Sequence, residues 1–409
     1  MGKIISLLRG RWLNYIGLCL FFLYVFLFSS LNGVSPFNHV ANGCLILLFC
    51  CSFLSVLLKK EWKKTENRVF FLIWFLLLFF FSLSDACNRS LSASSFALLI
   101  ALFSSYMLVK TSDFSLSTVL FAYLLAIALG LSVVVVINLK TIISIKAMYS
   151  MPFLNLDAFA AMARNGFCSG LVLIFGFRKT KHNPIMKISI ICFSTICMFY
   201  LFFSTRIGSL AIAVLFLLAL LFYYFWTKKK YLAILIAAFA FLFGFLSLVF
   251  LPIESSLLDR VRLSILQIFS PDFIYEASVR KRLMMILRDL PLSLRFPFFG
   301  LGSEYPGAIN STIGHNAFGT IALSYGWFSL CLFSALWILP SVHFLKKKEI
   351  STSTLYLLYF ALIQAMDLVY GFGTISRHNY LIVGLMFALY VKDKKKMKHS
   401  IRGSFFVNI

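Results

Sequence analysis

The stretch LSTVLFAYLLAIALGLSVVVVIN (residues 116–138) contains no charged side chain. As a helix it is long enough to cross the hydrocarbon core of a bilayer, which takes about 20 residues. Similar stretches recur along the whole 409-residue chain, and 61% of its residues are hydrophobic. A soluble chain of this length needs far more polar surface, so these apolar residues must face lipid. The sequence therefore predicts an all-α, polytopic integral membrane protein.

We expect about twelve transmembrane helices that form a single helical domain over residues 1–409. The expected spans are 13–33, 42–58, 69–84, 91–109, 116–138, 158–177, 185–203, 208–226, 231–252, 316–341, 353–373 and 379–391. The nine cysteines lie almost all inside these apolar runs. We interpret them as packing residues, and the sequence predicts no disulfide framework and no metal site.

Basic residues indicate the direction of the spans. One set of connections carries 25 of the 38 Lys and Arg residues, and 20 of these 25 are Lys. The set comprises Lys3, Arg9, Arg11, residues 59–68, Lys110, 178–187, 228–230, 346–348 and the tail from Lys392. Such loops face the cytoplasm, which places both termini there. The net charge of +24 is thus explained by topology and by attraction to membrane lipids, and we expect no binding to nucleic acid.

The other 13 basic residues face outward, and ten of them are Arg. The planar guanidinium binds two phosphate oxygens at once, which favours an outer site for a phosphate or diphosphate. Ordinary loop solubility and ion pairing remain the alternative. Seven of these cations lie in residues 253–315, a long connection of the kind that is usually functional. We expect this connection to be a large periplasmic loop carrying part of the active site.

The segment 278–290 within this loop has helical periodicity, with Arg280, Arg282 and Arg288 around an apolar stripe. We expect an amphipathic helix at the membrane surface, ended by Pro291, that holds these Arg residues at headgroup depth. The segment 298–305 that follows contains two glycines. We interpret it as a flexible turn that lets backbone approach the site.

Other charged residues lie at or within the spans. Arg206 is in the outer turn after residue 203, Arg164 is at the outer end of the sixth span, and Arg377 follows the eleventh. Arg206 has a snorkelling anchor as its alternative role. Asp367 falls inside the eleventh span, where a carboxylate needs a partner, and we expect an ion pair with Arg377 or His378.

In order along the chain come Ser204-Thr205-Arg206, Arg282, a turn with Pro297, Gly300 and Gly302, and the pair His315–Asn316 before the tenth span. This pattern over about residues 200–330 resembles the O-antigen ligase and O-antigen polymerase superfamily of bacterial envelope glycosyltransferases. The N-terminal half is similar only in hydropathy and in the number of spans. The Arg280–Lys281–Arg282 cluster leaves open which Arg holds the family's position, and no acid directly follows His315–Asn316.

The resemblance implies an enzyme of the inner (cytoplasmic) membrane whose active site faces the periplasm. A glycan on undecaprenyl diphosphate would move, with inversion and without metal or cofactor, to a sugar hydroxyl of lipid A–core. His315, Arg206 and Arg282 would be catalytic, and Arg280, Asn316, Arg164, Arg288 and Arg377 would bind substrate. Transfer to a second lipid-linked repeat, as in a polymerase, is the alternative. A flippase or transporter for lipid-linked sugars is a more distant one, and the sequence shows no paired halves with broken helices that would favour it.

Overall fold

The computed structural model describes residues 2–30, 35–89, 93–112, 114–138, 156–176, 184–204, 207–227, 291–303, 317–345 and 377–406, with a few isolated positions besides. Every regular element in these ranges is a helix, which confirms the all-α prediction for this part of the chain. Seven of these helices are long and apolar enough to cross a membrane. The protein is therefore an all-helical membrane protein.

Ten of the twelve expected spans overlap a described helix. The spans expected at 231–252 and 353–373 lie largely or wholly outside the described residues, so the number twelve stays a prediction. The third expected span is short, but the helix over it, α3 (Arg68–Cys87), ends three residues beyond the expected end of the span.

The chain divides into two compact units, each described by itself. Unit 1 comprises residues 1–25, 39–122 and 282–409, and unit 2 comprises residues 26–38 and 123–281. The single domain expected over residues 1–409 stays a prediction.

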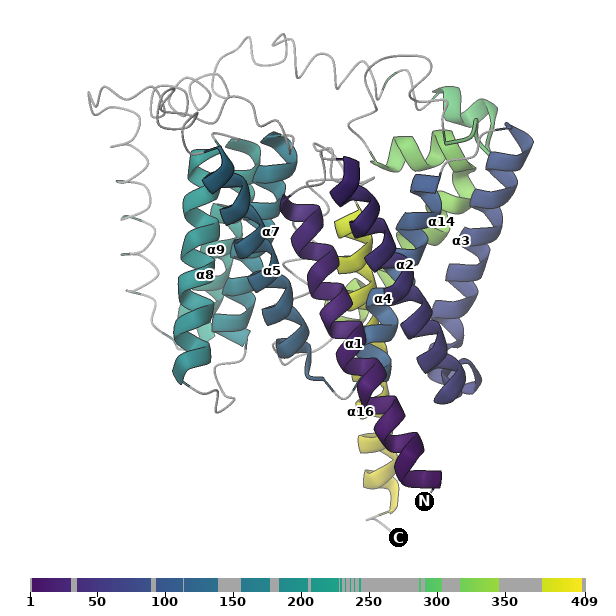
Figure 1. Cartoon of the computed structure of the whole chain (residues 1–409), viewed down its shortest axis with the longest axis horizontal. Coiled ribbons are helices and arrows are strands. Elements are labelled where there is room, and N and C mark those ends of the chain that lie inside the picture. Colours follow the sequence, from purple (N-terminus) through teal and green to yellow (C-terminus); the bar gives the residue numbers. More distant parts are fainter. Residues whose placement is uncertain are drawn as a thin grey trace. The chain divides into compact units, whose positions relative to one another are not determined.

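Unit 1 contains most of α1 (Gly2–Ser30) and α2 (Ser35–Leu58), together with α3 (Arg68–Cys87), α4 (Ala93–Thr111), α14 (Ala317–Leu345) and α16 (Arg377–Phe406). Helices α4 and α16, far apart in sequence, run side by side (Figure 1). A Cβ atom on Gly384 of α16 would lie 2.4 Å from the carbonyl oxygen of Leu102. The absent side chain therefore allows the two backbones to approach closely, as in many membrane helix pairs.

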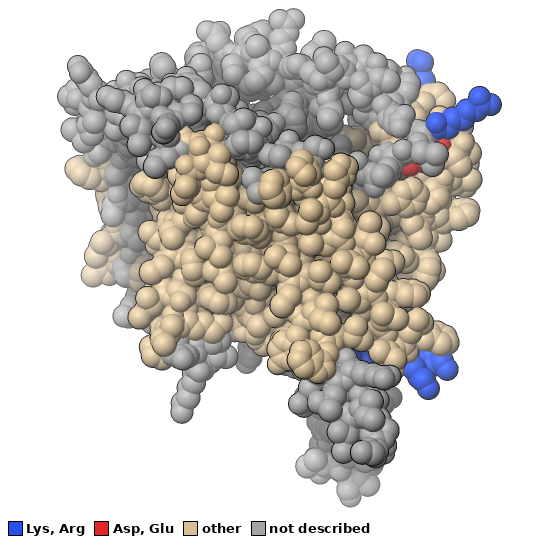
Figure 2. Space-filling model, viewed as in Figure 1, with Lys and Arg blue, Asp and Glu red and all other residues tan. Residues whose placement is uncertain are grey.

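Helix α3 is apolar on its buried and its exposed side. Its buried side chains include Phe70, Leu77 and Phe81, while Leu72 and Phe75 are more than half exposed. A helix that is apolar all round fits lipid on its outer face. At about 1.5 Å per residue its 20 residues span roughly 30 Å, the thickness of a bilayer core. On the face drawn in Figure 2, described charged side chains lie only at the margins of a broad uncharged surface.

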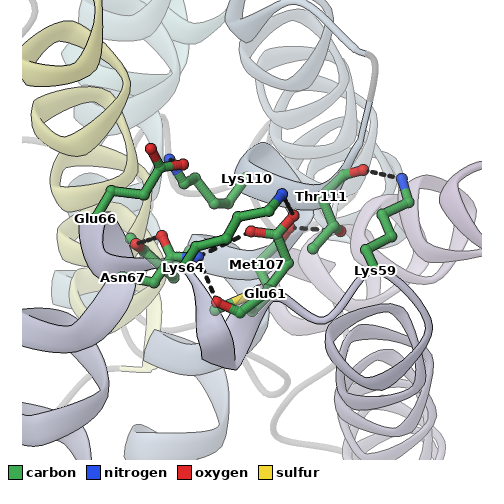
Figure 3. A network of polar contacts seen from close by, with 9 residues as sticks. Lys59, Glu61, Lys64, Glu66, Asn67, Met107, Lys110 and Thr111 are labelled. Atoms are coloured by element: carbon green, nitrogen blue, oxygen red, sulfur yellow. Dashed lines mark hydrogen bonds and ion pairs between the residues drawn. The ribbon is translucent and has the colours of Figure 1, made fainter. Parts of the chain in front are cut away.

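A polar network lies at one end of unit 1, which we call the basic end (Figure 3). It joins the connection between α2 and α3 to the last turn of α4. Lys110 Nζ donates to Glu66 Oε1 at 3.0 Å, and Lys59 Nζ donates to the carbonyl oxygen of Thr111. Asn67, fully buried, donates to Glu61 Oε2 at 2.8 Å and accepts from the Tyr106 hydroxyl at 2.8 Å.

The last parts of α14 and α16 meet at the same end. The ring of Phe387 on α16 lies 5.6 Å from that of Phe70, and His343 Nε2 lies 3.0 Å from Asp393 Oδ2. Basic segments that the sequence assigns to one side of the membrane thus lie at one end of unit 1. That this side is the cytoplasm stays a prediction.

Unit 2 contains most of α5 (Leu116–Ile137), together with α7 (Leu156–Gly176), α8 (Pro184–Phe203) and α9 (Ile207–Thr227). Helix α7 packs against both α8 and α9. A Cβ on Gly170 would lie 1.8 Å from Ser194 Oγ, so this glycine permits the close crossing of α7 and α8. Tyr200 of α8 donates to Ser132 Oγ of α5 at 2.9 Å.

Candidate functional site

Most of the predicted site residues lie outside the described residues, and their predicted roles stay predictions. These are Arg206, Arg280, Arg282, Arg288, His315, Asn316 and Asp367. Arg377 is the first residue of α16, and its side chain is not among those described. Among the described residues, no group of three or more His, Cys, Asp or Glu side chains could hold a metal ion.

Arg164 is the predicted site residue whose side chain the structure places. It lies eight residues after the start of α7, about 12 Å along the helix axis. Only 1% of it is exposed, and its Nε and Nη2 atoms lie 3.4 and 3.3 Å from Asn165 Oδ1. The apolar span begins at Ala158, as the sequence predicts, so Arg164 lies in the second turn of that span.

The second predicted feature that the structure describes is the glycine turn after Pro297. Residues 291–295 are helical, whereas residues 288–290 are outside the described part of the chain, so the end of the 278–290 helix at Pro291 stays a prediction. Proline keeps a helical φ angle, so Pro291 fits the helix over 291–295. Gly300 and Gly302 then adopt positive φ angles of 62° and 82°, which favour glycine.

This turn is held in place by backbone hydrogen bonds to α14. Leu301 N–H donates to the carbonyl oxygen of Leu323 at 2.8 Å, and Gly302 N–H donates to that of Ser324 at 3.0 Å. A Cβ on Gly300 would lie 2.4 Å from the carbonyl carbon of Ser324. The flexible turn expected from the sequence is therefore a fixed one, and the backbone that it approaches is that of α14.

Helix α14 is broken where the turn meets it. Gly326 has a φ angle of 82° and a ψ angle of 170°, and α14 bends near its N-terminal end (Figure 1). The N–H of Trp327, which would pair with Leu323 in a continuous helix, donates instead to the carbonyl oxygen of Pro297 at 2.7 Å. A break in a membrane helix is tolerated where protein groups satisfy the released backbone. The turn supplies those groups here.

The last turn of α3 contributes three side chains to the same place. Ser84 Oγ donates to the carbonyl oxygen of Ser324 at 2.7 Å, and Asp85 Oδ1 accepts from the N–H of Ser303 at 3.0 Å. Asn88 Nδ2 lies 3.5 Å from the carbonyl oxygen of Gly300. We call residues 84–88, 297–303 and 323–327 the α3–α14 junction.

Aromatic rings surround the junction. Phe81 of α3 stacks on Tyr325 of α14, with ring centroids 3.7 Å apart and planes 9° apart. On the outside, Phe328 stacks on Phe80 and on Phe298, each at 5.7 Å between centroids. The buried polar groups therefore sit under an apolar cover that strengthens their hydrogen bonds.

The sequence did not indicate that α3 takes part in the junction. The polar run SDACN (84–88) follows an apolar span, where Ser, Asp and Asn are expected simply because the helix leaves the lipid. The structure shows that Ser84 is fully buried and that Asp85 is 1% exposed. Chemically, the hydrogen bonds of the junction join its three segments to one another and hold the N-terminal part of α14.

No protein-family model matches the chain, and no curated protein is similar to it in sequence.

Proposed function

We propose that the protein is an O-antigen ligase, a glycosyltransferase that moves a glycan from undecaprenyl diphosphate to a sugar hydroxyl of lipid A–core. The observation that carries the proposal is the order and spacing of Arg206, Arg282, the 297–302 turn and His315–Asn316. The structure supports it at one point. The turn binds residues 323 and 324 of α14, the helix whose first described residue, Ala317, follows the His–Asn pair in sequence.

The chemistry of the transfer requires two functions from the protein. The bond from the anomeric carbon to the lipid diphosphate breaks while a bond from that carbon to the acceptor oxygen forms. Arg206 and Arg282 stabilise the negative charge on the departing diphosphate, with Arg280, Arg288, Arg164 and Arg377 as further anion-binding residues. His315 accepts the proton of the acceptor hydroxyl, and Asn316 orients the ring or the sugar. No step of this transfer needs a metal or a cofactor.

A polymerase is the second candidate, because it uses the same donor and differs only in its acceptor, a second lipid-linked repeat. A transporter gains one argument from the structure, since substrate sites of transporters often lie at broken helices. The break in α14 differs from those sites, because the carbonyl oxygens of Leu323 and Ser324 accept hydrogen bonds from the protein itself.

Reconstitution in liposomes with an undecaprenyl-diphosphate glycan and lipid A–core tests the proposal. We expect release of the lipid diphosphate and a glycosylated acceptor without ATP. His315→Gln and His315→Ala should each reduce transfer about 10²–10⁴-fold at equal protein level, because a general base is lost. Intact donor moved across the bilayer would identify a transporter, and near-normal transfer by His315→Gln would make this histidine a structural cap.

The lipopolysaccharide ladder of a deletion strain separates ligase from polymerase. Loss of every O-chain band is expected for a ligase. A core carrying a single repeat would identify a polymerase instead.

A further inference from the structure

The α3–α14 junction has a geometry that bears on the proposed reaction. Residue 303 is held by Asp85, and residues 323–327 are held by Ser84 and the 297–302 turn. In sequence, the pair His315–Asn316 lies between these two fixed parts of the junction, directly before Ala317.

The side chains of Ser84, Asp85 and Asn88 all bind backbone groups, and each binds a different segment of the junction. Ser84 binds α14, Asp85 binds Ser303, and Asn88 binds the 297–302 turn. Backbone contacts of this kind fix the path of a chain whatever its side chains are. Buried hydrogen bonds are also costly to leave unmade, and a charged acceptor such as Asp85 makes the stronger ones.

From this arrangement we infer that Ser84 and Asp85 are positioning residues for the glycosyl transfer, which rests on the function proposed above. They fix Ser303 and the N-terminal part of α14, and the acceptor-activating pair that they position lies between these in sequence. They touch neither donor nor acceptor. Displacement of a reacting group by about 1 Å costs on the order of 10²-fold in rate, so loss of these hydrogen bonds acts on kcat.

Four variants in the liposome assay test the inference. Asp85→Ala removes the acceptor for Ser303 N–H, whereas Asp85→Asn keeps an oxygen at the same place. Ser84→Ala removes only the hydroxyl that reaches α14. Ser82→Ala is the matched control, because Ser82 Oγ donates to the carbonyl oxygen of Leu78 within α3 itself, at 2.7 Å.

We expect kcat to fall roughly 10-fold to 10²-fold in Asp85→Ala and Ser84→Ala. The KM for the donor should stay within about threefold, because the diphosphate is bound by Arg residues outside the junction. Asp85→Asn should restore most of kcat, and Ser82→Ala should equal the wild type. Thermal unfolding of each variant shows whether the fold is kept, and Ser84→Ala carries the test if Asp85→Ala does not fold.

Wild-type kcat in both Ser84→Ala and Asp85→Ala would overturn the inference. So would an Asp85→Asn variant as slow as Asp85→Ala, because the effect would then come from the charge and not from the bond to Ser303. Failure of the proposed function looks different, since the wild-type protein itself would then transfer no glycan.

Discussion

The residue type at a single position, Arg or Lys, determines whether a basic side chain can bind two oxygens of a diphosphate at once. The ten Arg residues that the sequence predicts to face outward are the basis for the proposed anion site, and Arg206 and Arg282 stand at the positions that the resemblance implies are catalytic. The planar guanidinium donates two parallel hydrogen bonds to phosphate oxygens, whereas the ammonium of Lys is a point charge. The two residue types therefore differ in geometry and not in charge.

We predict that Arg206→Lys and Arg282→Lys reduce glycan transfer nearly as much as the corresponding changes to Ala, because the paired hydrogen bonds are lost while the charge is kept. Transfer in the liposome assay at equal protein level measures this. Arg295→Lys is the control, since Arg295 is exposed and holds no place in the motif. Full activity of both Lys variants would contradict the diphosphate clamp, and Arg280 is the next residue to change if Arg282 alone proves tolerant.

Tyr106 allows one hydrogen bond of the basic end to be removed alone. Its hydroxyl donates to Asn67 Oδ1 at 2.8 Å, and its ring stacks on Phe70 with centroids 3.6 Å apart. Tyr106→Phe keeps the stack and removes the donor, so the free energy of unfolding should fall by about 1–3 kcal/mol. Thermal unfolding in detergent measures the loss. Tyr15→Phe, at a side chain 57% exposed, is the control and should change stability by less than about 0.5 kcal/mol.

Helices were predictable from the sequence, but the break in α14 was not. An apolar run of about 20 residues predicts a membrane helix whatever its neighbours are, so ten expected spans overlap described helices, although α1 and α16 run well beyond their expected spans. Gly326 lies in the run LSYGWF, where a glycine is compatible with ordinary close packing. Its positive φ angle depends on hydrogen bonds from residues 297–302, and no local pattern reports those.

In the candidate site, too, contacts between distant segments could not be predicted from the sequence. Residue types that suit phosphate and proton transfer could be named from the sequence, and the turn at Pro297 could be marked as a close approach of backbone. The sequence did not reveal that the approach is to α14, or that Ser84 and Asp85 take part, because those contacts join segments more than 200 residues apart.

We predict that Gly326→Ala destabilises the protein, because the new Cβ would lie 2.4 Å from the carbonyl oxygen of Phe298 and the φ angle of 82° disfavours a side chain. Strain of this kind costs about 1–3 kcal/mol, and the clash adds to it. Gly43→Ala in α2 is the matched control. A Cβ there would meet no atom within 4 Å, so stability should change by less than about 1 kcal/mol. Equal melting temperatures for the two variants would contradict the break at Gly326.

At the scale of the whole molecule, the uneven distribution of basic residues predicts the orientation in the membrane. The contacts at the basic end show that residues 59–68, Lys110 and the last parts of α14 and α16 share one end of unit 1. We predict that reporters fused after Lys230 and Lys348 report the cytoplasm and that one near Glu276 reports the periplasm. Enzymatic reporters active on only one side of the membrane measure this. A cytoplasmic signal at residue 276 would overturn every proposed site residue on the outer face.

The α3–α14 junction also constrains how the chain is made. Ser84 and the carbonyl oxygen that it binds are separated by 240 residues. During synthesis α3 therefore enters the membrane long before its partner exists, and Ser84, Asp85 and Asn88 must meanwhile be hydrated at the lipid surface. Residues 297–303 are synthesised before α14, so the break in α14 and the hydrogen bonds that satisfy it can form together. Insertion of α3 and closure of the junction are thus separate events in the assembly of the protein.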